Sequence, residues 1–197
     1  LGEVEPYWDF ALQDNERDYA KSYFEHDKIF LIAPSSAKAQ KNWTLEGYTA
    51  LGRYAIAKGF TVGLLGGIAR NESALCAAIA QKLGPSCVNL CGRTSLRELL
   101  AVVSIGSLVL APDSGTMHLA SALHTPVIGM FAVHDEKRVG PWNYPDLCVS
   151  VYQQLAQKEL HGRPIPWRYR VRDPHAMEHI SIAAVMEKFD YACEKYL

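Results

Sequence analysis

The stretch from Ser107 to Phe131 brings together residue types that could bind an anion. Its polar segment Asp113-Ser114-Gly115-Thr116 lies between two apolar runs and opens an expected helix. Asp, Ser and Thr favour helix starts, and Gly115 lets a ligand approach the backbone closely. The free N–H groups of a helix start suit a phosphate, and His118 in the first turn could donate to the same anion. The segment therefore predicts an anion site, with a capped helix and a surface histidine as the alternative.

Three further loops carry similar chemistry and favour the anion site over that alternative. Ser35, Ser36 and Lys41 follow one expected strand, and they can offer hydroxyls and a mobile positive charge to phosphate oxygens. Glu72 follows another expected strand and could accept from sugar hydroxyls, and Thr94 lies in a glycine-containing loop. Because ligands of parallel α/β sheets bind at the carboxyl ends of the strands, we expect the four loops to form one nucleotide-diphosphate site.

Strand and helix patterns alternate along the chain, which predicts a mainly parallel sheet with helices on both faces. The expected strands are Ile29–Ala33, Thr61–Leu65, Cys87–Cys91, Ser107–Ala111, Val127–Phe131 and Leu147–Val151. The expected helices are Asn15–Glu25, one from Leu45 to the stop at Gly59, Glu72–Leu83, Leu96–Ser104, one that Asp113 opens, and Glu178–Tyr196. Thr44 and the Ser95/Glu98 pair are expected caps, and 132–146 and 153–174 are expected to be irregular.

The composition excludes several classes of protein. Of the 197 residues 49% are apolar and 21% charged, and the net charge is −1, which does not favour a nucleic-acid partner. The five cysteines fit a reducing compartment better than a disulfide framework. We expect no membrane span and no signal peptide, and the start at Leu1 suggests a piece of a longer chain.

Motifs for other nucleotide enzymes and for metal sites are weak or missing. The sequence has no G-x-x-x-x-G-K-[ST], no G-x-G-x-x-G and no G-x-S-x-G. Cys87 and Cys91 lack a second pair, and His175 and His179 lack an acidic third ligand. We therefore expect no metal and no cofactor.

The motifs in their order resemble one family, the ADP-heptose:lipopolysaccharide heptosyltransferases. The resemblance covers residues 29–142 well and rests on K-x-W (Lys41, Trp43), L-L-G-G (64–67), L-x-G-x-T-S-L (90–96), D-S-G-x-x-H-L-A-x-A (113–122) and Gly140-Pro141. The sequence departs from the family pattern in two places. Thr44 stands where a proline is common, and residues 132–135 stand where the family commonly has G-P-T-x-P.

The resemblance implies a fold and a domain organisation. These enzymes are GT-B glycosyltransferases, so the chain would be a Rossmann-like three-layer α/β domain, the C-terminal half of a GT-B fold. We expect a lead-in, interdomain segment over 1–27 and the donor-binding domain over 28–197, which ends in a helix. The N-terminal acceptor domain would be absent from this chain. Both ends of the chain, the final helix included, would contribute to the interdomain surface.

Roles for individual residues also follow from the resemblance. Ser35, Ser36 and Lys41 match the loop that holds the donor phosphates, Glu72 an acid near the ribose, and Thr94 a position near the adenine. The family's turn that binds the pyrophosphate and the sugar is matched by Asp113, Ser114, Gly115 and His118. Asp113 is expected to cap the turn or to accept from a sugar hydroxyl. The general base would lie in the other half, so no catalytic residue is assigned here.

The implied activity is transfer of heptose from ADP-heptose to the lipopolysaccharide inner core with inversion. A cytoplasmic location is implied, with peripheral contact to the inner membrane through the full-length protein. Two alternatives stay open at this point. One is a GT-B-like transferase or epimerase that uses another nucleotide sugar, and the other is a non-catalytic nucleotide-binding module.

Overall fold

A sheet of six parallel strands forms the centre of the part of the chain that the structure, a computed structural model, describes, namely residues 8–36 and 38–197. The strands are β1 (Ile29–Ile32), β2 (Thr61–Leu64), β3 (Cys87–Asn89), β4 (Leu108–Pro112), β5 (Val127–Phe131) and β6 (Cys148–Ser150). Their order across the sheet is β3-β2-β1-β4-β5-β6, and every neighbouring pair is parallel. The chain order therefore reverses between β1 and β4, which is where such sheets bind ligands.

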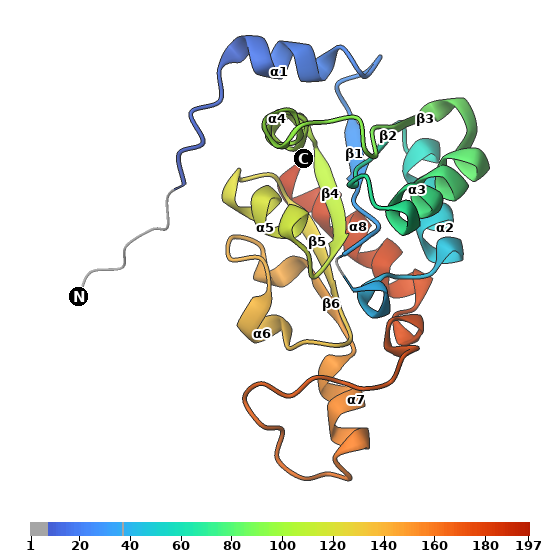
Figure 1. Cartoon of the computed structure of the whole chain (residues 1–197), viewed down its shortest axis with the longest axis vertical. Coiled ribbons are helices and arrows are strands. Elements are labelled where there is room, and N and C mark those ends of the chain that lie inside the picture. Colours follow the sequence, from blue (N-terminus) through green and yellow to red (C-terminus); the bar gives the residue numbers. More distant parts are fainter. Residues whose placement is uncertain (1–7, 37) are drawn as a thin grey trace.

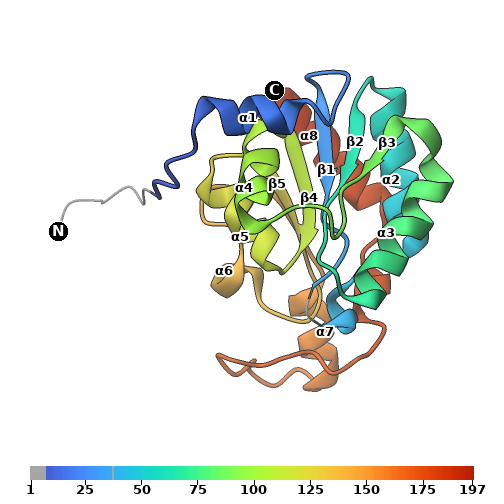
Figure 2. The same ribbon diagram turned by 45° about the horizontal axis from the view of Figure 1, so that its top comes forward.

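Helices cover both faces of the sheet (Figures 1 and 2). They are α1 (Asp14–Lys21), α2 (Leu45–Ala57), α3 (Arg70–Leu83), α4 (Leu96–Ile105), α5 (Gly115–Ala122), α6 (Glu136–Val139), α7 (Tyr152–Glu159) and α8 (Ile182–Tyr196). Short 3-10 turns are η1 (Ala39–Lys41), η2 (Gly84–Ser86), η3 (Pro145–Leu147) and η4 (Ala176–His179). Helix α2 packs against α3 and α8, whereas α4 packs against α1 and α5. The predicted Rossmann-like three-layer α/β domain with a mainly parallel sheet is confirmed.

The central strands are apolar throughout because both of their faces are covered. Strands β1, β4 and β5 are buried at every position. Phe30 of β1 meets the ring of Phe189 of α8 edge-on, with ring centroids 5.1 Å apart. This contact ties the last helix of the chain to the middle of the sheet.

Two of the expected helix caps are confirmed. The Thr44 hydroxyl accepts from the Gly47 N–H at 3.0 Å and begins α2. The hydroxyl of Ser95 and the carboxylate of Glu98 bond to each other's backbone N–H groups at the start of α4. These local signals needed no tertiary partner, which is why the sequence predicted them well.

Residues 153–174 were expected to be irregular, and this prediction is wrong for their first part. Helix α7 forms there and buries Tyr152, Leu155 and Ala156, which share one helix face. The helix is short, and the proline- and arginine-rich residues that follow it obscured its pattern. Residues 132–146 likewise contain the single turn of α6.

Several helix ends also differ from expectation. Helix α8 begins at Ile182 and not at Glu178, because the Ser181 hydroxyl accepts from the Ala184 N–H and starts a new helix after η4. Helix α1 ends at Lys21 instead of continuing to Glu25. Helix α3 begins two residues before Glu72.

The two ends of the chain behave differently from each other. Val185, Phe189 and Ala192 of α8 are buried in the core of this domain, whereas Tyr191 on the same helix is exposed, so a place of α8 on an interdomain surface stays a prediction. Helix α1 packs on α4, and Arg97 binds the Glu16 carboxylate at 2.5 Å, while Tyr19 is exposed. Residues 1–7 of the expected lead-in segment lie outside the described residues, so the division at residue 27 stays a prediction.

Trp43 and Tyr48 fix the loop that follows β1. The Trp43 indole is 4% exposed, and its Nε1 donates to the Ile180 carbonyl at 2.9 Å. The Tyr48 hydroxyl donates to the Pro34 carbonyl and accepts from the Trp43 N–H. Burial raises the pKa of this phenol. Both rings thus hold the two ends of the loop in place.

Replacing Gly47 by Ala should destabilise the protein. An added Cβ would lie 2.6 Å from the indole of Trp43, which cannot retreat because it is buried and hydrogen-bonded. Overpacking of this kind costs about 1–3 kcal/mol, more than the roughly 1 kcal/mol that alanine adds to helix propensity. Urea unfolding of both proteins measures the change.

Gly115→Ala is the matched control, because a Cβ there would meet nothing within 4 Å. We expect the urea concentration at its unfolding midpoint to equal or exceed that of the parent protein. A Gly47→Ala variant as stable as the Gly115→Ala variant would contradict the packing described around Trp43.

Candidate functional site

A pocket of about 550 Å³ opens at the carboxyl edge of the sheet, between the loops that follow β1, β2, β3 and β4. All of the predicted site residues line it: Ser35, Ser36, Lys41, Glu72, Thr94, Asp113, Ser114, Gly115 and His118. The parallel register brings the strand ends to one edge, and the loops meet there although they are far apart in the sequence. The sequence thus indicated residues that the fold brings together in one pocket, and their roles toward a ligand stay predictions.

The carboxylate of Asp113 is the electrostatic centre of the pocket. Its Oδ2 lies 3.1 Å from the Lys41 ammonium and 2.6 Å from Nδ1 of His134. The ammonium also donates to the Asp113 carbonyl at 2.5 Å. The side chains of Lys41, Asp113 and His134 are 14%, 15% and 11% exposed. The triad therefore joins the loops after β1, β4 and β5 in a half-buried environment.

The environment keeps Asp113 ionised. Burial alone would raise its pKa, but the hydrogen bond from His134 and the positive charge of Lys41 outweigh burial and hold the pKa below its usual 3.8. With an ionised carboxylate against Nδ1, the proton of a neutral His134 ring belongs on that nitrogen. Nε2 of His134 is buried without a hydrogen-bond partner among residues 8–36 and 38–197.

Asp113 does not cap helix α5, so the first of its two expected roles is wrong, and the second, accepting from a sugar hydroxyl, stays a prediction. Its carboxylate is engaged by Lys41 and His134 instead, and Ser114 occupies the N-cap position without a side-chain cap bond. The first N–H groups of a helix have no partner within the helix, so those of α5 remain able to bind an acceptor from outside.

Small polar groups surround this helix start. The hydroxyl oxygens of Ser35 and Ser114 are buried, and neither has a hydrogen-bond partner in the part of the chain that the structure describes. Gly115 is exposed, and no described atom beyond its chain neighbours and its own helix backbone lies within 4 Å of where its Cβ would be. The protein itself does not require a glycine here, so the space above it is available to a ligand.

The loop after β1 contributes two serines with different tasks. The Ser36 hydroxyl donates to the Lys38 carbonyl at 2.9 Å, and the Ser36 N–H donates to Asn42 Oδ1 at 2.9 Å. Ser36 therefore shapes the loop, while the hydroxyl of Ser35 is the freer donor. Lys41 follows in η1, at the end of the same loop.

The other end of the pocket is less polar. Leu65, Leu96 and Leu99 line it beside Thr94, and Leu96 is 68% exposed. An apolar surface with one hydroxyl suits a flat base, as base pockets combine stacking area with few polar groups. Thr94 itself is half-buried in the loop that leads into α4.

Glu72 and His118 complete the predicted set. One carboxylate oxygen of Glu72 accepts from the Gly67 N–H at 2.6 Å, so this acid already holds the turn after β2. His118 is exposed and lines the pocket one turn into α5. Both can contact a ligand, but only Glu72 also has a structural partner within the described residues.

His134 is the residue that sequence reasoning missed. It follows β5 at the same edge as the predicted loops, and the rule that ligands bind at the carboxyl ends of strands could have found it. In the sequence, residues 132–135 differ from the family pattern and carry no motif that indicates a role for His134. The hydrogen bond to Asp113, 21 residues away, is a tertiary contact that no local motif indicates.

Neither a metal site nor a membrane-spanning helix is found in the part of the chain that the structure describes. No group of three or more His, Cys, Asp or Glu side chains there could hold a metal ion. His175 pairs with Glu178, and His179 lies 3.3 Å from Asp173. None of the helices in residues 8–36 and 38–197 has the length and hydropathy that crossing a bilayer requires.

Comparison with known proteins places these features in one family. A statistical description of glycosyltransferase family 9 (heptosyltransferase) matches residues 2–165. The chain is 34% identical over 187 residues to the lipopolysaccharide core heptosyltransferase OpsX of Haemophilus influenzae, which covers 93% of this chain and 54% of the relative. The chain thus spans about half the length of the curated relatives it matches.

Solved structures share the fold. ADP-heptose lipopolysaccharide heptosyltransferase II of Escherichia coli superposes with a TM-score of 0.72 at 19% identity, over 98% of this chain and 54% of that one. A heptosyltransferase of the same organism, solved with ADP, superposes with a TM-score of 0.65 at 17% identity, over 89% and 48% of the two chains. The family description matches residues 2–165, which is most of this chain. The chain therefore belongs to glycosyltransferase family 9, the heptosyltransferases.

Proposed function

We propose that this chain is the donor-binding half of an inverting glycosyltransferase that transfers heptose from ADP-heptose to the lipopolysaccharide inner core. Membership of the heptosyltransferase family supports the reaction class. The observation that carries the proposal is the pocket, in which four strand-end loops surround the free start of α5. The N-terminal acceptor domain and the general base would belong to the other half of the enzyme.

The donor diphosphate would lie between Lys41, Ser35 and the start of α5. A half-buried anion needs several donors to replace its lost hydration, and this point offers an ammonium, backbone N–H groups and two hydroxyls that have no partner in the described part of the chain. The positive end of the α5 dipole adds to them. Ser36 supports this arrangement from behind by fixing its loop.

The nucleoside would extend towards β2 and β3. Thr94 and the leucines at that end would contact the adenine, and the free oxygen of Glu72 would accept from the ribose. The transferring sugar would then lie towards β5, near Asp113, Gly115 and His118. Asp113 would orient the sugar and hold Lys41, and would not contact the diphosphate itself.

The chemistry asked of this half is stabilisation of the leaving group. As the acceptor hydroxyl attacks the anomeric carbon, negative charge grows on the departing ADP, and donors already aimed at it lower the barrier. Lys41 and the α5 N–H groups would supply this stabilisation. We also propose that the full-length enzyme acts in the cytoplasm and contacts the inner membrane peripherally, because its acceptor is lipid-linked.

Titration calorimetry of the chain with ADP tests the proposal, with UDP as the competitor. We expect ADP to bind with one site and UDP to bind at least about tenfold more weakly, a difference of 1.4 kcal/mol. Tighter binding of UDP would favour the alternative of another nucleotide sugar. Failure of both to bind would contradict the donor site.

Lys41→Ala should weaken ADP binding by roughly 1–3 kcal/mol, the range for a charge-assisted hydrogen bond. The loss removes a cation and leaves the Asp113 carboxylate, still bonded to His134, less neutralised beside the diphosphate. Lys82→Ala, on an exposed position of the last turn of α3, is the control. Equal ADP affinity in all three proteins would exclude Lys41 from the site.

Gly115→Ala should weaken ADP binding while stability is kept. The methyl group would meet no protein atom, but it would occupy space where the diphosphate approaches the helix start. We expect about a tenfold loss of affinity by calorimetry, comparable to one overpacked contact, and an unchanged melting temperature. Unchanged affinity would mean that the anion does not approach α5 at this residue.

A further inference from the structure

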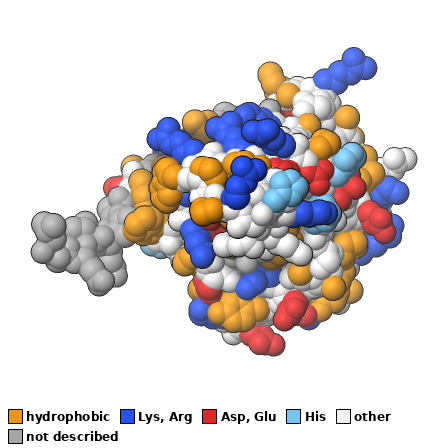
Figure 3. All heavy atoms as spheres, turned by 90° about the horizontal axis from the view of Figure 1, so that it is seen from below, with side chains coloured by type: hydrophobic (Ala, Val, Ile, Leu, Met, Phe, Trp, Pro, Cys, Tyr) orange, Lys and Arg blue, Asp and Glu red, His pale blue; other side chains and the backbone are white. Residues whose placement is uncertain are grey.

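A second cavity, of about 700 Å³, adjoins the donor pocket on the side of β5 and β6. Four cationic side chains line it, namely Lys38 from the loop after β1 and Arg168, Arg170 and Arg172 from the segment after α7. None of its lining residues is an Asp or a Glu. Lys and Arg side chains also gather on the face of the molecule in Figure 3.

The segment that carries the three arginines is held in place at several points. The Val171 N–H donates to the Val133 carbonyl at 3.1 Å, and the Gln40 amide donates to the Val171 carbonyl at 3.3 Å. The Tyr152 hydroxyl donates to the Tyr169 carbonyl, and the Tyr169 hydroxyl donates to the Glu159 carboxylate. The irregular segment therefore has a defined position, and it forms one wall of the cavity.

The cations of this cavity have no carboxylate partner among the described residues, whereas some lysines elsewhere in the fold do. Lys58 pairs with Asp190 at 2.6 Å, and Lys195 pairs with Asp146 at 2.8 Å. Within residues 8–36 and 38–197, by contrast, no ion pair or side-chain hydrogen bond involves the four cavity cations. The nearby Glu159 is occupied by Tyr169 and by the backbone N–H groups of Arg172 and Asp173.

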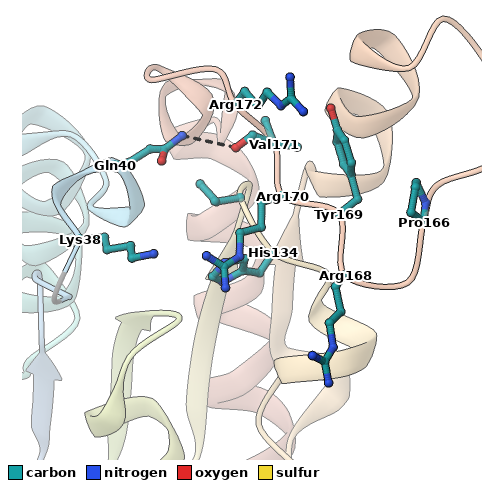
Figure 4. Close-up of a pocket in the computed structure, with 10 residues that line it drawn as sticks. Lys38, Gln40, His134, Pro166, Arg168, Tyr169, Arg170, Val171 and Arg172 are labelled. Carbon is teal, nitrogen blue, oxygen red and sulfur yellow. Dashed lines mark hydrogen bonds between the residues drawn. The ribbon is translucent and has the colours of Figure 1, made fainter.

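Figure 4 shows how the cations are directed. Lys38 extends its ammonium towards the guanidinium of Arg170, beside His134, while Arg168 and Arg172 point away from this place. Converging like charges repel each other unless an anion lies between them. Lys38 and Arg170 therefore define the centre of the cavity.

His134 connects this centre to the donor pocket. Its Nδ1 bonds to Asp113, which lines the donor pocket, and its ring lines the basic cavity. The buried Nε2 has no partner among the described residues. The place where the transferring sugar is proposed to lie thus adjoins an uncompensated cationic cavity.

We propose that this cavity is an acceptor subsite that binds sugar-linked phosphate or carboxylate groups and presents the acceptor to the donor. The proposal rests on the donor site of the proposed function and adds that this half also selects the acceptor by its charge. Arginine and lysine bind such groups strongly, and arginine does so through two parallel hydrogen bonds. Lys38 and Arg170 bind the anion, and His134 Nε2, which carries no proton in the neutral ring, accepts a hydrogen bond from a hydroxyl of the adjoining sugar.

The test is an NMR titration of the chain, saturated with ADP, with glucose 1,6-bisphosphate as the anionic sugar. We expect shifts at Val133, Arg170 and Val171 while ADP stays bound. The double variant Lys38→Gln/Arg170→Gln should bind the sugar bisphosphate at least about tenfold more weakly, since it loses two charge-assisted contacts. Its affinity for ADP should stay within about twofold of the parent, because neither residue lines the donor pocket.

The matched control is Lys158→Gln/Arg163→Gln. It removes the same charge from exposed positions near the same segment, and neither residue lines the cavity. We expect it to bind the sugar bisphosphate like the parent. A loss equal to that of the cavity variant would show attraction by net charge and would overturn the proposal.

Other outcomes separate the two proposals from each other. If ADP binds and the sugar bisphosphate does not, or if ADP displaces it, the acceptor subsite is wrong and the donor site stands. If the sugar bisphosphate binds in the cavity and ADP does not bind, the donor site is wrong. Trp167, 74% exposed beside Arg168, makes a lipid surface the competing source of anions.

A vesicle arm decides that competition. We expect phosphatidylcholine vesicles with phosphatidylglycerol to bind the cavity variant and the charge-matched Lys158→Gln/Arg163→Gln control equally in sedimentation. Vesicle binding that is lost in Lys38→Gln/Arg170→Gln, without binding of the free sugar bisphosphate, would assign the cavity to lipid headgroups and contradict the acceptor subsite.

Discussion

The carboxylate of Asp113 is shared by three loops, and the candidate site depends on this sharing. It holds the Lys41 ammonium at the end of β1's loop and the His134 imidazole after β5, while its own backbone leads into α5. A half-buried carboxylate between two nitrogen donors stays charged and fixes both donors. Without it, Lys41 would keep only its hydrogen bond to the Asp113 carbonyl and would lose its ion pair. The same carboxylate connects the donor pocket with the basic cavity through His134.

The sheet makes this arrangement possible by separating stability from chemistry. The continuous apolar strands β1, β4 and β5 and the helices on both faces provide the core, so that the carboxyl edge can carry polar groups without partners. The buried side chains of Tyr48 and Trp43 anchor the loop of Ser35 and Lys41 to the core, because the Tyr48 hydroxyl is hydrogen-bonded to the backbone at both ends of the loop. Groups that would be costly to leave unpaired in the core are tolerated at the edge, where a ligand can satisfy them.

Sequence patterns predicted the elements whose signals are local. The strands, the Thr44 cap and the Ser95/Glu98 box formed as expected because the residues that decide them are neighbours in the chain. The capping role of Asp113 was wrong because its partners lie 72 and 21 residues away, and a cap rule considers only adjacent positions. Helix α7 was missed because its apolar face is short and precedes a segment rich in proline and arginine. His134 and the basic cavity depend on how the 166–172 segment returns to the sheet edge, which only tertiary contacts decide.

A crystal structure of the chain with ADP tests the central claim most directly. The account predicts that the diphosphate lies at the start of α5, within hydrogen-bond distance of the Gly115 N–H and the Ser114 and Ser35 hydroxyls. Lys41 should turn from the Asp113 carbonyl towards the phosphate oxygens, and Asp113 should keep its bond to His134. A diphosphate bound in the cavity of Lys38 and Arg170, with Lys41 unmoved and the α5 start vacant, would contradict the account.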